Sequence, residues 1–363
     1  MKAKTVKWIL SLTLIFGALG FIASCSDDDN KKKEGNKDEL IATIAAAQAL
    51  LDNTEEGSLE GQYIVGSKAI LQAQIDLAQA VVDDDNASQT AIDNTNVNLT
   101  LAIATYQDAF VKAIQKDDLI AQWKFDDGSG TTAKDYSDNG HDGTFEAGHA
   151  AAGGGGVPTW VADRRGDANK ALHFTKGAHI VVPSHPDFGP SEITITVWVN
   201  VDSLNTSSCS AFNDRCANGK FKDNYIISQN GYKGYKFQTQ DDLYPFFTVN
   251  TGTEGPYIDR AANTSIKMKG WYFLAVTFKA NEMKFYIDGV DVTKSGSDGA
   301  VSGSFGAFTR TNFAIGQETP NADVPSDISW VLAHFEGSMD ELKMYKKALS
   351  ATQIGQIYNQ EKP

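Results

Sequence analysis

The sequence predicts a multidomain chain: a bundle of three α-helices, followed by an all-β antiparallel jelly-roll sandwich. Between residues 38 and 116, apolar residues recur every three or four positions, as on the buried faces of packed helices. From Leu119 onward, short runs rich in aromatic and β-branched residues alternate with glycine-containing turns. With 363 residues, 41% of them hydrophobic, the chain can bury a sizeable core in each part.

The composition excludes several classes of protein. The chain has 46 acidic and 32 basic residues, a formal charge of −14. A general nucleic-acid binder is excluded because neutralising phosphates requires a basic surface. Three cysteines are too few for a disulfide framework or for a zinc site made of four thiolates.

The N-terminus has the order of an export signal. Lysines precede an apolar run at 8–22, and small residues then lead to Cys25. This order predicts a signal peptide at 1–24. It resembles a bacterial lipoprotein signal, which implies that Cys25 carries a lipid anchor; ordinary cleavage beside an incidental cysteine is the alternative. The acidic residues SDDD at 26–29 resemble the signal that takes lipoproteins to the outer leaflet in Gram-negative glycan degraders. The resemblance implies a lipid-anchored outer-membrane protein, exposed at the surface on a polar tether, 25–37.

The region 38–116 predicts a three-helix antiparallel bundle. Aspartates and Asn86 at 83–86 supply turn and N-cap residues before the third helix. EGQY at 60–63 and SKAIL at 67–71 resemble FIVAR-type helical modules of bacterial surface proteins. Those modules act mostly as spacers, and some bind sugars or host proteins, so both roles stay open. The apolar stripes are Leu40, Ile44, Ala47 and Leu51; Leu71, Ile75, Ala78 and Val82; and Leu99, Ile103, Tyr106 and Phe110.

The second part, 119–363, predicts a series of short strands. Asp288-Gly289 is a two-residue hairpin turn, and Ser350 caps a final helix that runs to Tyr358. We expect strands at 119–125, 171–174, 179–182, 193–201, 225–228, 246–249, 271–279, 283–287, 290–293 and 335–345.

The order of motifs in this part resembles the LamG-like family of concanavalin A-type jelly rolls, which includes laminin G and pentraxin domains. The resemblance spans the whole of 119–363 and implies a lectin-like sandwich. The motifs are WKFDDGSG (123–130), DYSDNGHDG (135–143), KALHF (170–174), ITVWV (195–199), WYFLAVT (271–277), FYIDG (285–289) and FEGSMDELKMY (335–345).

Several glycosidases share this sandwich, so an enzyme is one possible function. A retaining glycosidase needs two carboxylates about 5–5.5 Å apart, which alternate residues of one strand could supply. Asp340 and Glu341 are adjacent, so their side chains are expected on opposite faces of the last strand. The chain also has no His-x-x-x-His pair and no Gly-x-Ser-x-Gly motif. We therefore expect no enzyme activity and no catalytic residue.

A structural calcium ion is the cofactor that the sequence suggests, because calcium binds carboxylate and carbonyl oxygens in turns. The family often binds one calcium where the two ends of the domain meet, and Asp126 and Asp340 match the acids of its first and last motifs. Asp135 and Asn139 could add ligands. The alternative is that these residues only form Asx turns and bond backbone amides.

Aromatic residues in predicted loops are the candidates for sugar binding. A pyranose presents one apolar face to an aromatic ring and hydroxyls at its edge, so polar neighbours are needed too. Loops longer than about 12–15 residues are usually functional or disordered, and the connection at 317–333 has this length. The alternative is that each ring covers the rim of the sandwich. The candidate residues are Tyr232, Tyr235, Tyr244, Tyr257, Asp327 and Trp330.

Cys209 and Cys216 remain as a pair if Cys25 is lipidated, and in an exported protein we expect them to form a disulfide. The sequence as a whole predicts a non-catalytic cell-surface lipoprotein that binds a glycan through its sandwich, with the helical bundle as spacer. A protein-binding adhesion module of the same architecture is the alternative, and a glycoside hydrolase is a third. The partners are then a glycan or surface protein and the membrane, with no nucleic acid.

Overall fold

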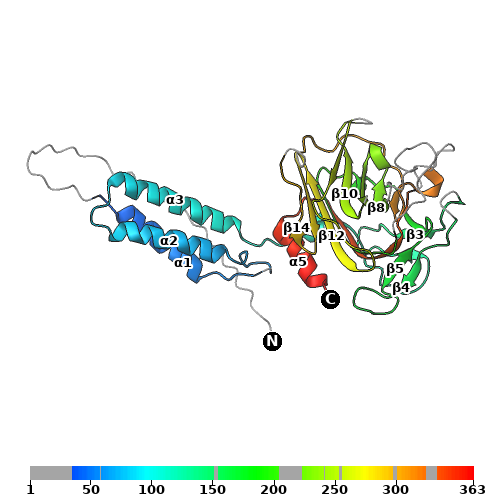
Figure 1. The fold of residues 1–363 in the computed structure, drawn as a ribbon, viewed down its shortest axis with the longest axis horizontal. Coiled ribbons are helices and arrows are strands. Elements are labelled where there is room, and N and C mark those ends of the chain that lie inside the picture. The colour runs from blue at the N-terminus through cyan, green and yellow to red at the C-terminus, as the bar shows by residue number, and fades with distance from the viewer. Residues whose placement is uncertain are drawn as a thin grey trace, which may run out of the picture.

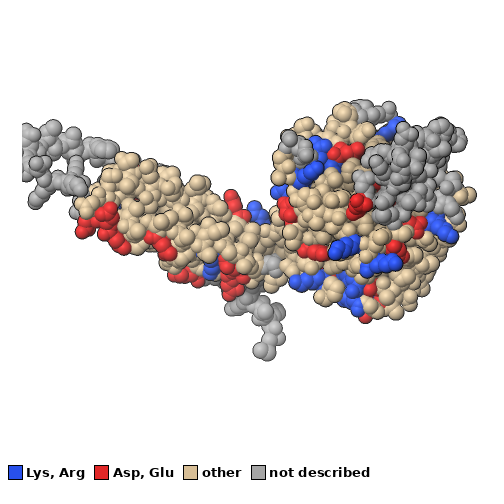
Figure 2. Space-filling view, viewed as in Figure 1, with Lys and Arg blue, Asp and Glu red and all other residues tan. Residues whose placement is uncertain are grey.

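The computed structural model describes residues 35–57, 59–150, 154–203, 223–240, 242–252, 256–296, 301–323 and 333–363. Within them, a helical bundle precedes a two-sheet β-sandwich, as the sequence predicts (Figure 1). No helix in these ranges is both long and apolar enough to span a membrane. In the view of Figure 2, acidic side chains gather along one side of the bundle, whereas acidic and basic side chains mix on the sandwich.

The bundle consists of α1 (Asp38–Asp52), α2 (Ser67–Asp83) and α3 (Gln89–Asp108). Each helix packs the stripe that its periodicity predicts, except that Phe110 lies beyond the end of α3 and is 39% exposed. Tyr106 also bonds Thr54 through its hydroxyl at 2.6 Å. The N-cap of α3 is Ser88, not the aspartate run before it, because the Ser88 hydroxyl accepts from the Ala91 amide at 3.2 Å. The buried residues shared by the three helices are Leu40, Ala47, Leu51, Leu71, Ile75, Ala78, Ile92, Leu99 and Tyr106.

The sandwich has two eight-stranded sheets whose strand pairings are antiparallel. The first sheet runs β14 (Val290–Asp291), β13 (Glu282–Ile287), β12 (Trp271–Lys279), β7 (Ile193–Val201), β16 (Gly337–Tyr345), β5 (Ala171–Phe174) and β4 (Thr159–Val161), and β1 (Leu119–Trp123) pairs with β16. The second runs β11 (Tyr257–Ala261), β10 (Tyr244–Asn250), β9 (Tyr235–Gln240), β8 (Asn224–Gln229), β15 (Phe313–Ile315), β6 (His179–Val182), β3 (Gly143–Glu146) and β2 (Thr132–Ala133).

The two ends of the sandwich sequence meet, as the family resemblance implies. Trp123 of β1 lies opposite Leu342 of β16 in an antiparallel pair. Trp123 is fully buried between the sheets, where its ring stacks on Phe313 with centroids 5.8 Å apart. Its indole donates to the carbonyl of His141 at 2.8 Å, so the one polar atom of this core side chain is paired.

Two predicted local motifs form as expected. Asp288 and Gly289 both have positive φ, 50° and 77°, and join β13 to β14 as a two-residue hairpin turn requires. Ser350 and Gln353 form a capping box at the start of α5 (Ala351–Glu361). Helix α5 then packs Ile354 and Ile357 on the outer side of the first sheet, in a cluster with Trp198 and other aromatic residues.

Glu336, just before β16, is hydrogen-bonded to the turn that follows β5. Its carboxylate accepts from the Thr175 hydroxyl at 2.9 Å, from the Lys176 amide at 2.7 Å and from the His334 ring at 2.8 Å. Burial alone would raise the pKa of Glu336, but these hydrogen bonds outweigh it and hold the pKa below its usual value of 4.5. A carboxyl with a lowered pKa stabilises the fold above its unfolded pKa and loses that contribution as the pH falls.

We therefore expect Glu336→Gln to lower the free energy of unfolding at pH 7 by about 1–2 kcal/mol. The difference from the unsubstituted protein is expected to shrink as the pH falls below about 4.5, where the carboxylate becomes protonated. Thermal melts of both proteins at pH 7 and pH 3 check this. An equal difference at the two pH values would show that the charge of Glu336 is not what holds the turn.

Candidate functional site: a polar face on the second sheet

Strands β8 to β11 carry polar side chains on the face that is turned away from the core. In β9, Tyr235 and Phe237 point into the core, and alternation places Lys236 and Gln238 on the other face. The register extends this face across the sheet, because Lys236 lies opposite Thr248 of β10 and Thr248 lies opposite Asp259 of β11. We call this the polar face; its residues are Tyr225, Lys236, Gln238, Thr248, Tyr257 and Asp259.

At the centre of the polar face is a buried ion pair. Lys236 Nζ lies 3.2 Å from Glu318 Oε1, and the two side chains are 0% and 2% exposed. The same ammonium is 2.9 Å from the Tyr225 hydroxyl and 3.4 Å from the centroid of the Tyr232 ring. Burial favours a neutral lysine, but Glu318 and Tyr232 together outweigh it and raise the pKa of Lys236, so the cation persists.

Two tyrosines stand at the rim of this cluster. The rings of Tyr232 and Tyr257 have centroids 5.0 Å apart at an angle of 55°, and Tyr257 is 52% exposed. Asp259 lies two residues along the same strand and accepts from the Thr248 hydroxyl at 2.6 Å. Burial raises the pKa of Asp259. Gln238 Oε1 is buried and accepts no hydrogen bond from any residue that the structure describes.

The structure separates the predicted binding residues. Tyr232 and Tyr257 come together as just described. Tyr244 is 36% exposed and begins β10, six residues from Asn250, the partner of Tyr257, which corresponds to about 20 Å along the strand. The prediction that Tyr235 lies in a loop and contacts a ligand is wrong: it opens β9, is 0% exposed and donates its hydroxyl to the Phe188 carbonyl at 3.0 Å.

Five of the predicted site residues lie outside the described ranges. They are Cys25, Cys209, Cys216, Asp327 and Trp330. Lipidation, the disulfide and the contribution of the 317–333 connection therefore stay predictions.

Sequence reasoning missed the charged centre of the polar face. The signal was the alternation in YKFQTQ, which sets Lys236 and Gln238 against the aromatic residues of the same strand. It was overlooked because the glycines at 231 and 234 suggested that the loop continues through Tyr235. Glu318 follows β15, 82 residues after Lys236, and no local pattern connects the two.

The four residues expected to hold calcium all have partners within the chain. Burial raises the pKa of both Asp126 and Asp340, and the negative charges of Glu341 and Asp163 add to this in both cases. The cation on the Asp340 carboxylate is the buried guanidinium of Arg164. Lys170 Nζ likewise lies 3.9 Å from Asp126 Oδ1 and 2.8 Å from its carbonyl oxygen.

The other two residues are engaged in the turn that follows β2. The Asp135 carboxylate accepts from the amides of Gln122, Ser137 and His141 and from the Ser137 hydroxyl, at 2.7–2.9 Å. Asn139 donates its amide to the carbonyls of Leu119 and Ile120, both at 2.9 Å. Donors of the chain thus occupy the carboxylates of Asp340 and Asp135 and the carbonyl of Asp126, and Asn139 is held through its nitrogen, so the set as arranged does not fit a calcium ion.

Chelation tests directly whether a calcium ion binds to these residues in spite of their partners. With Arg164 and Lys170 already facing the two acids, we expect excess EGTA to leave the melting temperature unchanged. Differential scanning calorimetry with EGTA and with added calcium measures this. A fall of about 2–4 °C or more on chelation, the shift per kcal/mol for a domain of this size, would show that calcium stabilises the fold.

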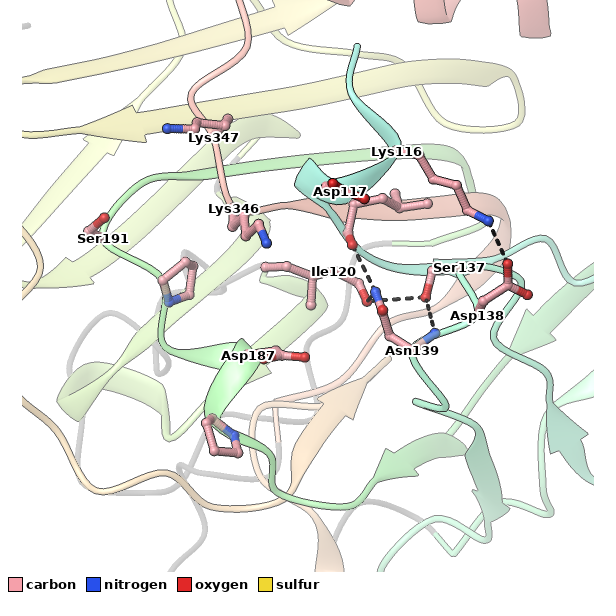
Figure 3. A pocket seen from close by; sticks show the side chains of 13 residues that line it. Lys116, Asp117, Ile120, Ser137, Asp138, Asn139, Asp187, Ser191, Lys346 and Lys347 are labelled. Carbon is pink, nitrogen blue, oxygen red and sulfur yellow. Dashed lines mark hydrogen bonds and ion pairs between the residues drawn. The ribbon is translucent and has the colours of Figure 1, made fainter.

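A cavity of about 870 Å³ lies at the edge of the sandwich where β1 begins. Its walls come from 116–120, the turn at 137–139, the 3₁₀ helix Pro186–Phe188 and residues 346–347 after β16 (Figure 3). Lys116 and Asp138 form an exposed ion pair at 2.6 Å beside it, and the Asp187 side chain points into it. This cavity lies apart from the polar face, on residues of different strands.

The chain belongs to the concanavalin A-like lectin/glucanases superfamily, whose family model matches residues 174–355. A search of curated proteins finds no match.

Solved structures with a similar fold include domain 4 of AbnA, a GH43 extracellular arabinanase from Geobacillus stearothermophilus in complex with arabinotriose (19% identity, TM-score 0.45, 66% of this chain and 98% of that chain). The binding domain of Paraclostridial Mosquitocidal Protein 1 has 17% identity and a TM-score of 0.46, over 68% of this chain and 52% of that chain. A Trypanosoma rangeli sialidase has 12% identity and a TM-score of 0.43, over 73% of this chain and 39% of that chain.

Proposed function

We propose that this chain is a non-catalytic, surface-anchored protein that binds a glycan on the polar face of its sandwich. The observation that carries the proposal is the pair of tyrosines, Tyr232 and Tyr257, beside buried polar groups on one sheet face. The apolar face of a pyranose packs on such rings, and its hydroxyls take hydrogen bonds from neighbours. Asp259 is partly exposed at the edge of this face, and its carboxylate, which already accepts from Thr248, is the acceptor that a sugar hydroxyl can reach.

The state of the two carboxylates at this site supports binding rather than catalysis. Glycoside hydrolysis by retention needs one carboxyl as acid and a second as nucleophile, about 5–5.5 Å apart. Glu318 is paired with Lys236, and Asp259 accepts from Thr248, so both are committed to protein partners. The absence of catalysis is part of the proposal.

The anchoring and spacing roles rest on the sequence and on the helical module. We propose that a lipid on Cys25 and the tether at 25–37 attach the chain to the outer membrane. The bundle then holds the sandwich away from the membrane. A groove of about 290 Å³ on the bundle, between α2 and α3, is lined by apolar side chains including Ile64, Val65 and Ile70, so this module also has a surface for recognition.

A glycan array probed with the whole chain tests the proposal. We expect saturable binding to one class of oligosaccharide, with no release of reducing ends on prolonged incubation. Two outcomes would overturn it. Binding to no glycan, together with capture of a defined surface protein, would favour the adhesion module, and hydrolysis of a bound glycan would show an enzyme.

A further inference from the structure

Two histidines and an aspartate come together at the edge of the sandwich, outside the polar face. His141 Nε2 lies 3.1 Å from Asp187 Oδ2, and His185 Nδ1 lies 3.2 Å from the same oxygen. One ligand atom from each of the three side chains lies within 4.8 Å of the others. Among the described residues, this is the one group of three or more His, Cys, Asp or Glu side chains that meets so closely.

The backbone around this cluster is fixed by hydrogen bonds from both sides. The amide of His141 donates to Asp135 at 2.9 Å, and its carbonyl accepts from the Trp123 indole at 2.8 Å. His185 precedes the 3₁₀ helix Pro186–Phe188 and accepts from the Asp187 amide at 3.3 Å. The fully buried Phe188 ring packs against the ring of His141, with centroids 4.8 Å apart. The three side chains are therefore held near one another by the fold itself.

We propose that His141, His185 and Asp187 bind a divalent transition-metal ion, with Zn²⁺ as the best fit. Imidazole nitrogen and carboxylate oxygen are the ligands that Zn²⁺ prefers. Ligand atoms at about 2.0–2.1 Å from a tetrahedral zinc lie about 3.3 Å from one another. Two of the three separations, 3.1 and 3.2 Å from Asp187 Oδ2 to the imidazole nitrogens, match this spacing, and the two nitrogens lie within 4.8 Å of each other. Calcium and magnesium bind oxygen rather than nitrogen and do not fit this set.

Three protein ligands leave a fourth position of a tetrahedral zinc to water or to a ligand. His141 is buried, while His185 and Asp187 are about half exposed, so the cluster is reachable from solvent. Asp187 also lines the cavity of about 870 Å³ at the start of β1 and points into it (Figure 3). An ion held here would lie at the wall of this cavity.

His173 forms an isolated pair with one carboxylate. His173 Nε2 lies 2.8 Å from Asp202 Oδ2, closer than either contact in the cluster. Within the described residues, no second histidine or further carboxylate joins that pair in a metal-binding group. His173 therefore provides a matched control, with a histidine–carboxylate contact but without a third ligand.

Isothermal titration calorimetry with ZnCl₂ tests the proposal. The titration should use protein without a polyhistidine tag that is first dialysed against EDTA. Its cysteines should be alkylated so that thiolates cannot bind zinc. We expect one saturable site. We expect His185→Ala and Asp187→Asn each to weaken binding at least tenfold, and His173→Ala to leave it unchanged. Zn²⁺ should also raise the melting temperature of the unsubstituted protein, whereas CaCl₂ and MgCl₂ at the same concentration should not.

Both variants change exposed side chains, and far-UV circular dichroism of the metal-free proteins shows that they are folded before titration. The absence of saturable zinc binding would overturn the proposal. So would equal zinc affinity in the unsubstituted protein and in both cluster variants, since the ion would then bind elsewhere. Neither result depends on glycan binding, so the metal site and the proposed function are tested separately.

Discussion

Replacing Lys236 by methionine is expected to lower the free energy of unfolding of the sandwich by about 3–5 kcal/mol. The substitution keeps most of the side-chain volume and leaves Glu318 without its cation, 2% exposed. Burial already raises the pKa of Glu318 against the opposing effect of Lys236, so the lone carboxylate is costly in this environment. Urea unfolding followed by tryptophan fluorescence measures the effect, because between residues 35 and 363 all tryptophans belong to the sandwich.

Two further variants show whether the effect comes from the unpaired charge. Lys236→Met combined with Glu318→Leu removes both charges and is expected to recover most of the lost stability. Lys279→Met breaks an ion pair of similar length, 3.3 Å to Glu282, but both side chains are about half exposed, so we expect a loss below about 1 kcal/mol. Equal losses in Lys236→Met and Lys279→Met would contradict the account of the buried pair.

Arg164→Met is expected to have a comparable effect at the opposite sheet. The guanidinium pairs with the buried Asp340, donates to the carbonyl of Glu361 at 2.8 Å and lies 5.1 Å from the centroid of the Trp198 ring. It therefore connects β16 to the end of α5. Removal of one partner of such a buried pair costs about 3–5 kcal/mol when the remaining group is charged.

The pH dependence of this loss identifies its cause. Burial, opposed by Arg164, raises the pKa of Asp340 from 3.8 to about 8. A carboxyl with a raised pKa contributes stability below its unfolded pKa, and this contribution is lost as the pH rises toward the folded value. Without Arg164 the folded pKa rises further, so the loss continues above pH 8. The destabilisation by Arg164→Met should therefore be larger at pH 9 than at pH 5.

Urea unfolding of the unsubstituted protein and of Arg164→Met, at pH 5 and at pH 9, measures how the loss of stability depends on pH. Arg165→Met is the control, because Arg165 also donates to the carbonyl of Glu361, at 2.6 Å, but is not paired with Asp340. Its effect should be small and the same at both pH values. If Arg164→Met also lowered the free energy of unfolding by the same small amount at both pH values, the charge of Asp340 would not explain the stabilisation by Arg164.

The sequence predicts the fold well wherever a pattern is local. Asp288-Gly289 predicts a hairpin because its positive φ angles suit few other pairs of residues, and Ser350 predicts a helix start because serine is a favoured N-cap residue. The adjacency of β1 and β16 is not local, and it was expected only through the resemblance to a family. The fold class is confirmed in both parts of the chain.

The candidate sites depend on contacts between residues that are far apart in the sequence, and local sequence patterns do not predict such contacts. Arg164 and Asp340 are 176 residues apart, and nothing near Asp340 in the sequence reveals that its carboxylate faces this guanidinium. His141 and Asp187 are 46 residues apart and likewise meet only in the folded chain. Tyr235 is a different case, because its position was predicted from local sequence. The glycines just before it favour a loop, whereas the alternation from Tyr235 onward indicates the strand β9 that the structure shows.

The central claim is that the polar face of β8 to β11 binds the glycan. The most direct test is the dissociation constant of the oligosaccharide that the array selects, measured for the unsubstituted chain, for Tyr257→Ala with Tyr232→Ala, and for Tyr136→Ala. Tyr136 serves as the control. Its side chain is partly exposed, and its backbone amide donates a hydrogen bond to the carbonyl of Gln122 in β1. Loss of the two rings should weaken binding about tenfold or more, that is by about 1.4 kcal/mol, and Tyr136→Ala should not change it. Unchanged affinity in the double variant would contradict the claim and place the glycan elsewhere on the molecule.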